Sequence, residues 1–278
     1  MEPCDLGALE ARRRIGARSL SPVELLESCW RRIDAVNAPL NGIVAEDRER
    51  ALKEARAAEQ AVAHGRALGP LHGLPVGIKD MVDTAGLRTT YGSLEFRHHV
   101  PAADAGLVTR LRQAGAIVHW KTNTPEWAAG GNTFNPVYGV SGNPFDPALT
   151  CGGSSGGSGI ALAAGMLPLA HGSDNAGSLR IPAAFCGVVG MRPSAGLVPN
   201  ERRAYGPAPL SVEGPMGRSV RDTWLLLAAY ASDDARDPLA GHVDPRLLRE
   251  PVPADLSRLR VAFSADLGGF APVDSHLG

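Results

Sequence analysis

A strand, a helix and a second strand follow one another between residues 74 and 120, and this alternation limits the fold more than any other feature of the sequence. Residues 74–78 form a short apolar run bounded by turn residues, which predicts a buried strand. Residues 104–114 carry apolar side chains at helical spacing, and residues 117–120 form another apolar run. Because strands joined by such a helix usually pair in parallel, we expect an α/β fold with a mixed, largely parallel central sheet flanked by helices.

The rest of the chain supplies further elements. Residues 1–65 read as helical: Ser21 and Pro22 open one helix, and Asp47 opens another that stops at Gly65. The later part of the chain predicts helices at 160–164 and 220–230 and strands at 187–191 and 259–263.

Composition excludes several classes of protein. The formal net charge of −1 gives no electrostatic reason to expect nucleic acid or an anionic membrane as a partner. No apolar run approaches the ~18 residues of a membrane-spanning helix, and the N-terminus lacks the apolar segment of a signal peptide. The four cysteines form no C-x-x-C pair, which argues against a metal site or a disulfide framework. We therefore expect a cytoplasmic protein in a reducing compartment.

Residues 152–159 form a Gly/Ser tract, GGSSGGSG, that admits four interpretations. A flexible linker needs no apolar helix immediately after it, yet this tract runs straight into the helical residues 160–164. A phosphate-binding P-loop needs a Gly-Lys-Ser/Thr end, and no lysine occurs after Lys121. The linker is thus the weaker interpretation, and the P-loop is excluded.

A third interpretation is a nucleophile elbow, because residues 152–156 match the pattern G-x-S-x-G. The elbow requires a strand directly before it, whereas residues 143–147, NPFDP, have the chemistry of a loop. It also requires a histidine later in the chain as the base, and His171 and His242 are the leading candidates. In this interpretation Ser154 would be the nucleophile.

The fourth interpretation combines the tract with a second serine and a lysine. Ser178 stands among small residues in the segment 172–182, GSDNAGSLRIP, and Lys79 ends the strand predicted at 74–78. Small residues let the backbone turn tightly and bring consecutive N–H groups close to a ligand oxygen. An acyl-transfer site needs such donors to hold the oxyanion of its tetrahedral intermediate.

The motifs of this fourth interpretation resemble the amidase signature family. The resemblance extends from Leu9 to Pro272, and the three blocks that carry the chemistry occur in the family's order. The matching segments are 73–83 (GLPVGIKDMVD), 119–125 (HWKTNTP), 150–165 (TCGGSSGGSGIALAAG) and 172–193 (GSDNAGSLRIPAAFCGVVGMRP).

The resemblance implies a role for each of three side chains. Ser178 would be the nucleophile, Ser154 a bridging serine in an unusual cis geometry, and Lys79 the general base. The oxyanion donors would be the backbone N–H groups of Asn175, Ala176, Gly177 and Ser178.

Physical chemistry makes this Ser-Ser-Lys arrangement coherent. A serine hydroxyl is a poor nucleophile unless a base takes its proton as it attacks. A lysine serves as that base only when neutral, and burial at a strand end would depress the pKa of Lys79. Ser154 can accept a proton from one partner and donate one to the other. Such a site needs no histidine, metal or cofactor.

Two positions depart from the family pattern. Ala176 stands where many members carry glycine, and alanine is small enough if its φ is negative. Cys151 replaces a frequent proline before the glycine pair, and we expect no loss of activity from this change.

The resemblance implies an amidohydrolase that cleaves a carboxamide C–N bond through an acyl-enzyme on Ser178. Its partner would be a small-molecule amide, with a homodimer left open. Within the family, the alternative is the glutamine-using A subunit of a tRNA-dependent amidotransferase, although residues 121–127, KTNTPEW, look more like the free-standing amidases. A third alternative is a catalytically silent truncated fragment.

We expect residues 1–278 to form a single domain, with a helical N-terminal segment about 1–66 and a catalytic α/β core about 67–278. Members of the family are typically longer, and Asp274 stands where an N-cap would begin another helix. We therefore expect later strands of the sheet to be missing. The 278-residue chain alone should then fold poorly or self-associate through its uncovered strand edge.

Overall fold

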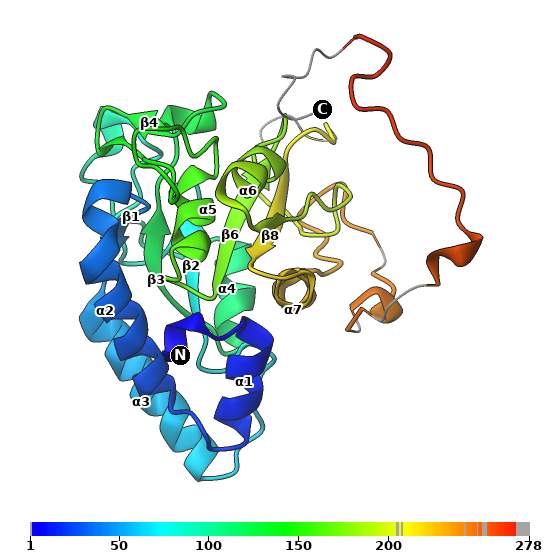
Figure 1. The fold of residues 1–278 in the computed structure, drawn as a ribbon. Helices are drawn as coiled ribbons and strands as arrows, with labels where there is room; N and C mark the ends of the chain where they lie inside the picture. The colour runs from blue at the N-terminus through cyan, green and yellow to red at the C-terminus, as the bar shows by residue number, and fades with distance from the viewer. Residues whose placement is uncertain are drawn as a thin grey trace.

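A six-stranded sheet forms the centre of the molecule (Figure 1). The computed structural model describes residues 2–203, 206, 208–241, 243–248, 250–251 and 255–270. The strands follow the order β1-β3-β2-β6-β8-β7 across the sheet, and β4 and β5 form a separate pair. The bounds are Ile43–Glu46 (β1), Pro75–Lys79 (β2), Ile117–Thr122 (β3), Phe134–Asn135 (β4), Gly139–Val140 (β5), Leu169–Asp174 (β6), Val189–Gly190 (β7) and Val212–Gly217 (β8).

The sheet is mixed, and most of its strands run in one direction. β2 pairs in parallel with β3 on one side and with β6 on the other. β1 is antiparallel to β3, β8 is antiparallel to β6, and β7 is antiparallel to β8. β7 therefore runs in the same direction as the parallel trio of β2, β3 and β6. The mixed, largely parallel sheet expected from the sequence is thus confirmed. The trio also brings the carboxyl ends of β2 and β6 to the same end of the sheet.

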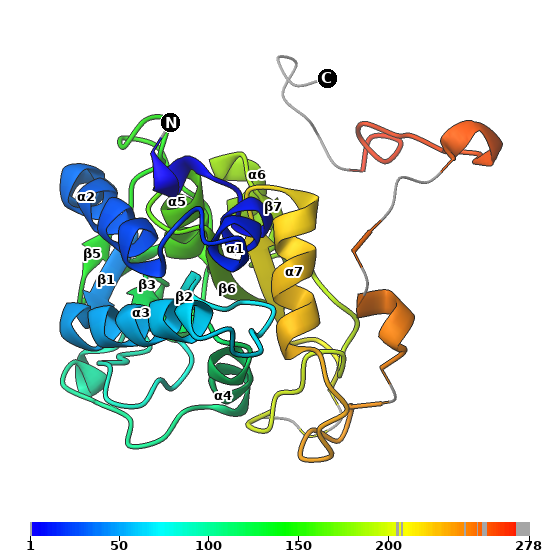
Figure 2. The same ribbon diagram turned by 90° about the horizontal axis from the view of Figure 1, so that it is seen from below.

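Helices cover both faces of the sheet (Figure 2). α5 contacts β2, β3 and β6 and packs on α6, whereas α7 contacts β6, β7 and β8 with α1 and α4 beside it. No helix among the described residues is long and apolar enough to cross a bilayer. The bounds are Ala8–Gly16 (α1), Pro22–Leu40 (α2), Arg48–Ala63 (α3), Gly106–Gln113 (α4), Gly156–Ala163 (α5), Arg180–Cys186 (α6) and Val220–Tyr230 (α7).

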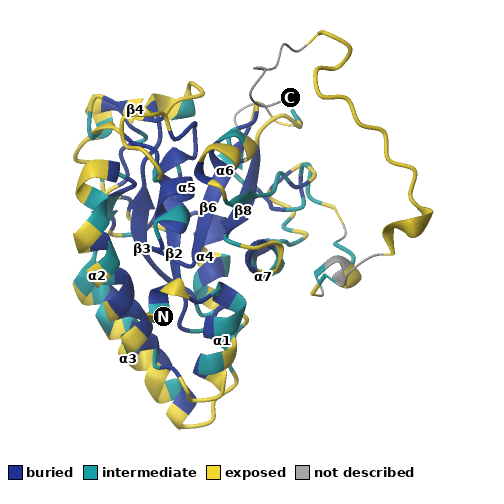
Figure 3. Ribbon diagram, in the orientation of Figure 1, coloured by how far each residue is buried: buried dark blue, intermediate teal, exposed yellow. Residues whose placement is uncertain are grey.

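The strands at the centre of the sheet consist mainly of buried residues (Figure 3). One cluster joins α1, α4 and α7 to Val76 and Ile78 of β2. A second cluster joins α5 to Ile117 and Trp120 of β3. The four cysteines are free and buried within these two clusters. Packing on both faces of the sheet thus holds the parallel trio in place, including its carboxyl end.

Local sequence signals predict several element boundaries correctly. Ser21 caps α2 by accepting from Val23 N and completes a capping box with Glu24. Asp47 caps α3 by accepting from Arg50 N. The elements β2, α4 and β3 also occur where the strand, helix and strand alternation predicts them.

Three predicted elements differ in extent. The N-terminal segment read as helical contains β1, whose four residues pair with β3 between two helices. The helix predicted at 160–164 begins earlier, at Gly156 inside the Gly/Ser tract. The strand predicted at 187–191 shortens to β7, because α6 ends only at Cys186 and Gly187 adopts the left-handed C-cap conformation.

The strand predicted at 259–263 is wrong. These residues form no strand in the described part of the chain, and Val261 and Phe263 are 83% and 90% exposed. An apolar run becomes a strand only where a partner offers backbone hydrogen bonds, and here none does. The helix start predicted at Asp274 lies outside the described residues.

Candidate active site

Lys79 is the last residue of β2, and its side chain is fully buried. Its Nζ lies 2.7 Å from Ser154 Oγ and 3.0 Å from Ser173 Oγ. Ser154 precedes α5, whereas Ser173 belongs to β6, the parallel neighbour of β2. Because parallel strands finish at the same end of a sheet, a lysine and two hydroxyl groups from three separate segments meet there.

Burial changes the acid–base behaviour of this lysine. It lowers the pKa of Lys79 from 10.5 to about 7, against the attraction of Glu213 and Asp174. A substantial fraction of the amine is therefore unprotonated near neutral pH and able to accept a proton.

The loop that carries Ser154 is tied to the neighbouring segments. The peptide bond between Gly153 and Ser154 is cis, in agreement with the geometry that the resemblance implied. Ser155 N donates to Ser178 O at 3.2 Å. Ser155 Oγ donates to Ser173 O and accepts from Ser173 N, each at 3.2 Å. These hydrogen bonds join the loop that carries Ser154 to the end of β6 and to the segment that carries Ser178.

The glycines of the tract allow α5 to approach the sheet closely. A Cβ at Gly157 would lie 2.1 Å from Asn123 N and 2.5 Å from Gly42 O. Gly157 N donates to Asn123 O at 3.1 Å. Only glycine leaves room for this contact, which explains why a helix begins inside a Gly/Ser sequence.

Ser178 lies in the turn between β6 and α6, and Asp174 organises that turn. Asp174 Oδ1 accepts from Gly177 N at 2.8 Å, and Oδ2 accepts from Leu179 N at 3.1 Å. The residues on both sides of Ser178 are therefore bound to one carboxylate. Gly177 has a φ of 108°, a conformation that L-residues rarely adopt, so the turn requires glycine.

Two arginines hold the carboxylate of Asp174 in place. Arg180 Nε lies 3.1 Å from Oδ2, and Arg192 Nη1 lies 3.2 Å from Oδ1. Burial by itself would raise the pKa of Asp174, but hydrogen bonds from Arg180, Gly177 and Leu179 lower it to about 2. The carboxylate is therefore ionised at neutral pH and remains an acceptor for the turn.

Three of the four expected oxyanion donors are unoccupied. The N–H groups of Asn175, Ala176 and Ser178 have no acceptor within the described part of the chain. Gly177 N–H differs, because it already donates to Asp174. The φ of Ala176 is not positive, so alanine fits this position without strain.

A cavity of about 630 Å³ opens beside these groups. Ser154, Ser173, Asn175 and Ser178 all lie on its wall. The structure thus brings both predicted serines to one cavity, with Lys79 in contact with Ser154. A molecule in this cavity would contact Ser178 without reaching the buried amine.

The nucleophile-elbow interpretation of Ser154 does not match the structure. Residues 143–153, all of them described, form turns and loops, so no strand leads directly into this serine. One candidate base, His171, is buried on β6 with its Nε2 2.8 Å from Glu213 Oε2. The other, His242, lies outside the described residues.

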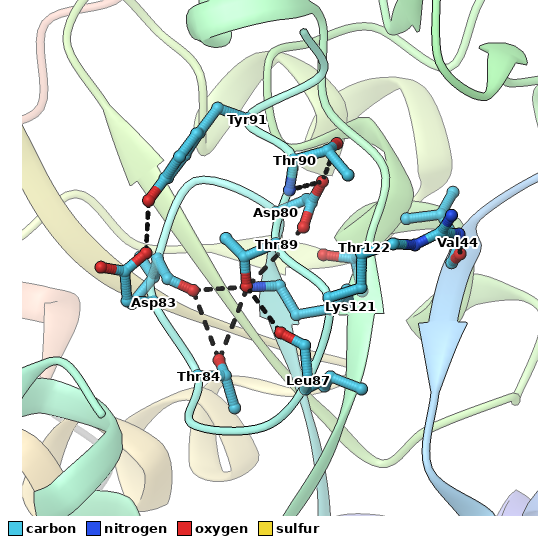
Figure 4. A network of polar contacts seen from close by, with 12 residues as sticks. Val44, Asp80, Asp83, Thr84, Leu87, Thr89, Thr90, Tyr91, Lys121 and Thr122 are labelled. Atoms are coloured by element: carbon cyan, nitrogen blue, oxygen red, sulfur yellow. Dashed lines mark hydrogen bonds and ion pairs between the residues drawn. The ribbon is translucent and has the colours of Figure 1, made fainter. Parts of the chain in front are cut away.

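A second buried lysine fastens the loop after β2 (Figure 4). Lys121 of β3 donates to the carbonyl oxygen of Val82 and to Thr89 Oγ1, the latter at 3.0 Å. Its Nζ lies 3.7 Å from Asp80 Oδ1, and Asp80 Oδ2 accepts from Thr90 N and Oγ1. Val82 also lines the cavity, so this network fixes one of the cavity walls to the sheet.

The substitution Lys121→Met is expected to lower the free energy of unfolding by about 3 kcal/mol at pH 7. Burial lowers the pKa of Lys121 to about 8, so the side chain still carries its charge at pH 7, and its loss removes the positive charge that acts most strongly on the buried Asp80. Urea denaturation measures the change. Lys53→Met, at an exposed position of α3, is the matched control and should stay within about 0.5 kcal/mol. Equal effects of the two substitutions would contradict a stabilising role for the Lys121 network.

The fold and the site together define an α/β protein with two serines on the wall of one cavity and a buried lysine in contact with one of them. The family model described as Amidase matches residues 24–276, and the chain belongs to this family. The resemblance seen in the sequence motifs is therefore confirmed.

Individual relatives agree with this assignment. An acylamidase of Rhodococcus erythropolis is 41% identical over 263 residues, which cover 95% of this chain and 55% of that protein. The A subunit of the glutamyl-tRNA(Gln) amidotransferase of Carboxydothermus hydrogenoformans is 40% identical, over 88% of this chain and 50% of that protein. The solved structure of a bacterial aryl acylamidase of the amidase signature family aligns with a TM-score of 0.81 and 31% identity, covering 86% of this chain and 50% of that chain. The chain thus spans about half the length of the curated relatives it matches.

Proposed function

We propose that this chain hydrolyses a carboxamide through an acyl-enzyme on Ser178, with Ser154 and Lys79 transferring the protons. The observation that carries the proposal is the 2.7 Å contact between Lys79 Nζ and Ser154 Oγ, beside a cavity whose wall also holds Ser178. A lysine with a pKa of about 7 can take up a proton near neutral pH. The similarity to enzymes named acylamidase supports an amide as the substrate.

In the acylation step, Ser178 Oγ attacks the carbonyl carbon of the amide. Its proton passes to Ser154 Oγ as the proton of Ser154 passes to the neutral amine of Lys79. The oxyanion that forms is held by the free backbone N–H groups around Ser178, with Asn175 and Ala176 as its nearest donors in the chain. When the C–N bond breaks, Lys79 returns the proton through Ser154 to the leaving nitrogen.

In the deacylation step, water attacks the ester on Ser178. Its proton follows the same path through Ser154 to Lys79 and then returns to Ser178 Oγ as the ester C–O bond breaks. The products are a carboxylic acid and free enzyme, so every atom and proton is accounted for. The proposed chemistry needs only groups of the chain itself.

The proposal includes the setting of the reaction. We infer that one domain carries the site in an α/β core that begins at about residue 67, and that the partner is a small-molecule amide rather than nucleic acid. The four free cysteines fit a cytoplasmic location. A homodimer is compatible with this proposal and does not contribute to the proton path.

The second candidate is the glutamine-using A subunit of a tRNA-dependent amidotransferase, favoured by the 40% identity to such a protein. The two candidates differ in their amide donor. A free-standing amidase releases ammonia from simple carboxamides, whereas the amidotransferase component would use glutamine and depend on added partner subunits. Ammonia release measured with each substrate separates them.

Covalent labelling tests the nucleophile without a known substrate. A fluorophosphonate probe should form an adduct on Ser178 rather than on Ser154 or Ser155, because Ser178 alone lies among its own oxyanion donors. Peptide mapping by mass spectrometry locates the adduct, and Ser178→Ala should abolish it. An adduct on Ser154 would move the nucleophile to that residue. The absence of any adduct on the folded chain would favour a catalytically silent fragment.

A further inference from the structure

Glu213 is a buried carboxylate beside the catalytic lysine that no step of the proposed mechanism uses. It lies on β8, directly opposite Ser173 of β6 in the antiparallel register. Side chains of such cross-strand pairs are neighbours, with Cβ atoms about 5 Å apart. Because Ser173 Oγ is 3.0 Å from Lys79 Nζ, Glu213 is separated from the lysine by a single side chain. Glu213 also lines the same cavity as Ser154 and Ser178.

Both carboxylate oxygens of Glu213 are occupied by the protein. His171 Nε2 lies 2.8 Å from Oε2, and Asn200 Nδ2 donates to Oε1 at 3.1 Å. An ionised carboxylate can only accept, so the hydrogen in the first contact belongs to His171. The side chain of Glu213 is therefore held in one position by His171 and Asn200.

We propose that Glu213 is a positioning residue that acts through Lys79, its fixed carboxylate setting the pH range over which the lysine accepts the serine proton. The proposal rests on the function proposed above, in which Lys79 is the base. In this role His171 and Asn200 serve to keep the carboxylate at a constant distance from the amine.

The charge of Glu213 opposes the effect of burial on Lys79. Burial lowers the pKa of Lys79 to about 7, and Glu213 is the largest of the charges that resist this, followed by Asp174. The two carboxylates differ in their partners. Asp174 is bound to two arginines, which offset its charge, whereas Glu213 has no arginine or lysine within ion-pair distance in the described part of the chain and is bound to the ring of His171 and the carboxamide of Asn200. Glu213 is therefore the carboxylate better able to stabilise the ammonium form of Lys79.

Other ionisable groups around this pair have their own partners. Arg202 pairs with Asp83 and Arg203 with Asp237. Glu201 accepts from a backbone N–H of α4. From α7, the ring of Tyr230 contacts that of His171, and burial raises the pKa of Tyr230 well above its ordinary value. Tyr230 is thus neutral over the working range and does not change the charge near Lys79.

The substitution Glu213→Gln should therefore weaken Lys79 as a base in two measurable ways. Without the carboxylate the ammonium form is less stable, so the pKa of Lys79 falls, and the acidic limb of kcat/KM moves to lower pH by the same amount. The plateau of kcat should fall as well, because the ammonium that forms during acylation loses its counter-charge. If Glu213 had a purely structural role, its replacement would lower the plateau of kcat and leave the acidic limb of kcat/KM at the same pH.

NMR of the purified chain with 13Cε-labelled lysine tests this without turnover. The sequence contains only Lys53, Lys79 and Lys121, so single Lys→Arg variants assign the three resonances. In Glu213→Gln the Lys79 resonance should titrate about one pH unit lower than in the parent chain. Glu201→Gln is the matched control, because it removes one negative charge from the wall of the same cavity and should leave the Lys79 titration in place.

A second variant covers the case in which Glu213→Gln unfolds the chain. Glu213→Asp keeps the charge but withdraws it by one methylene, so the Lys79 titration should fall between those of the parent and the glutamine variant. An unchanged Lys79 titration in a folded Glu213 variant would overturn the proposal. Failure of the proposed function has a different signature: Lys79 would titrate as described, but Ser178→Ala would leave amide turnover intact.

Discussion

Replacing Ser178 by alanine should reduce kcat/KM for a carboxamide substrate by about 10⁵-fold. The substitution removes the one atom that forms the acyl bond, while the turn around it is retained by Asp174 through Gly177 and Leu179. The variant should therefore keep its fold and its substrate affinity. Ammonia release under single-turnover and steady-state conditions gives the rate, and circular dichroism verifies the fold.

Ser155→Ala provides the comparison for this prediction. Ser155 is buried next to Ser154, but within the described residues its hydroxyl group hydrogen-bonds only to the backbone of Ser173, so the loss of activity should be about tenfold or less. If Ser178→Ala and Ser155→Ala lowered the rate equally, Ser178 could not be the nucleophile.

Lys79→Met and Ser154→Ala should each lower kcat by about 10³- to 10⁴-fold. The first substitution removes the final proton acceptor, and the second removes the hydroxyl group that lies 2.7 Å from it. Because the two groups act in series, the kcat of the double variant should lie within a few-fold of the kcat of the slower single variant. Additive losses, multiplying to about 10⁷-fold, would show that the two side chains act independently.

Two further variants, His171→Gln and Glu54→Gln, test whether acid–base groups outside the proposed path of Ser154 and Lys79 contribute to kcat. Glu54 contacts His119 away from the cavity, and its change should leave kcat within about two-fold of the parent value. His171 acts only through Glu213, so its change should move the pH profile far more than the plateau rate. A loss with His171→Gln as large as that with Lys79→Met would place the base on the histidine.

The elements with strong local signals could be predicted from the sequence. β2, α4 and β3 combine short apolar runs with helical spacing, and α2 and α3 begin at side chains that cap them. These signals depend on neighbours within one or two turns, so they survive without knowledge of the tertiary structure.

β6 and β8 could not be predicted in this way. β6 is LAHGSD and β8 is VEGPMG, and both contain residues typical of turns. Two of their glycines are required by close packing. A Cβ at Gly172 would lie 2.7 Å from the side chain of Leu179, and one at Gly214 would lie 2.4 Å from the same side chain. Tertiary contacts thus override the local preference of these two strands.

The residues of the candidate site likewise divide into those with a local sequence signal and those that depend on tertiary contacts. The motifs predicted Lys79, Ser154 and Ser178, and the structure places Lys79 against Ser154 and both serines at one cavity. Ser173 and Glu213 were not predicted, because their proximity to the lysine depends on the pairing of β6 with β2 and β8. Asp174 did have a sequence signal, since it stands four residues before Ser178 in the same small-residue segment.

The four buried cysteines have a practical consequence for work on this chain. Burial raises the pKa of Cys151 to about 11 and that of Cys186 to about 12, so almost no thiolate exists at neutral pH in the folded state. Alkylating reagents should therefore modify these thiols only when the surrounding core opens. Cys4 and Cys29 belong to the cluster with α1 and α7, whereas Cys151 and Cys186 belong to the cluster with α5. Timed alkylation would thus report, without any engineered label, which side of the sheet opens first.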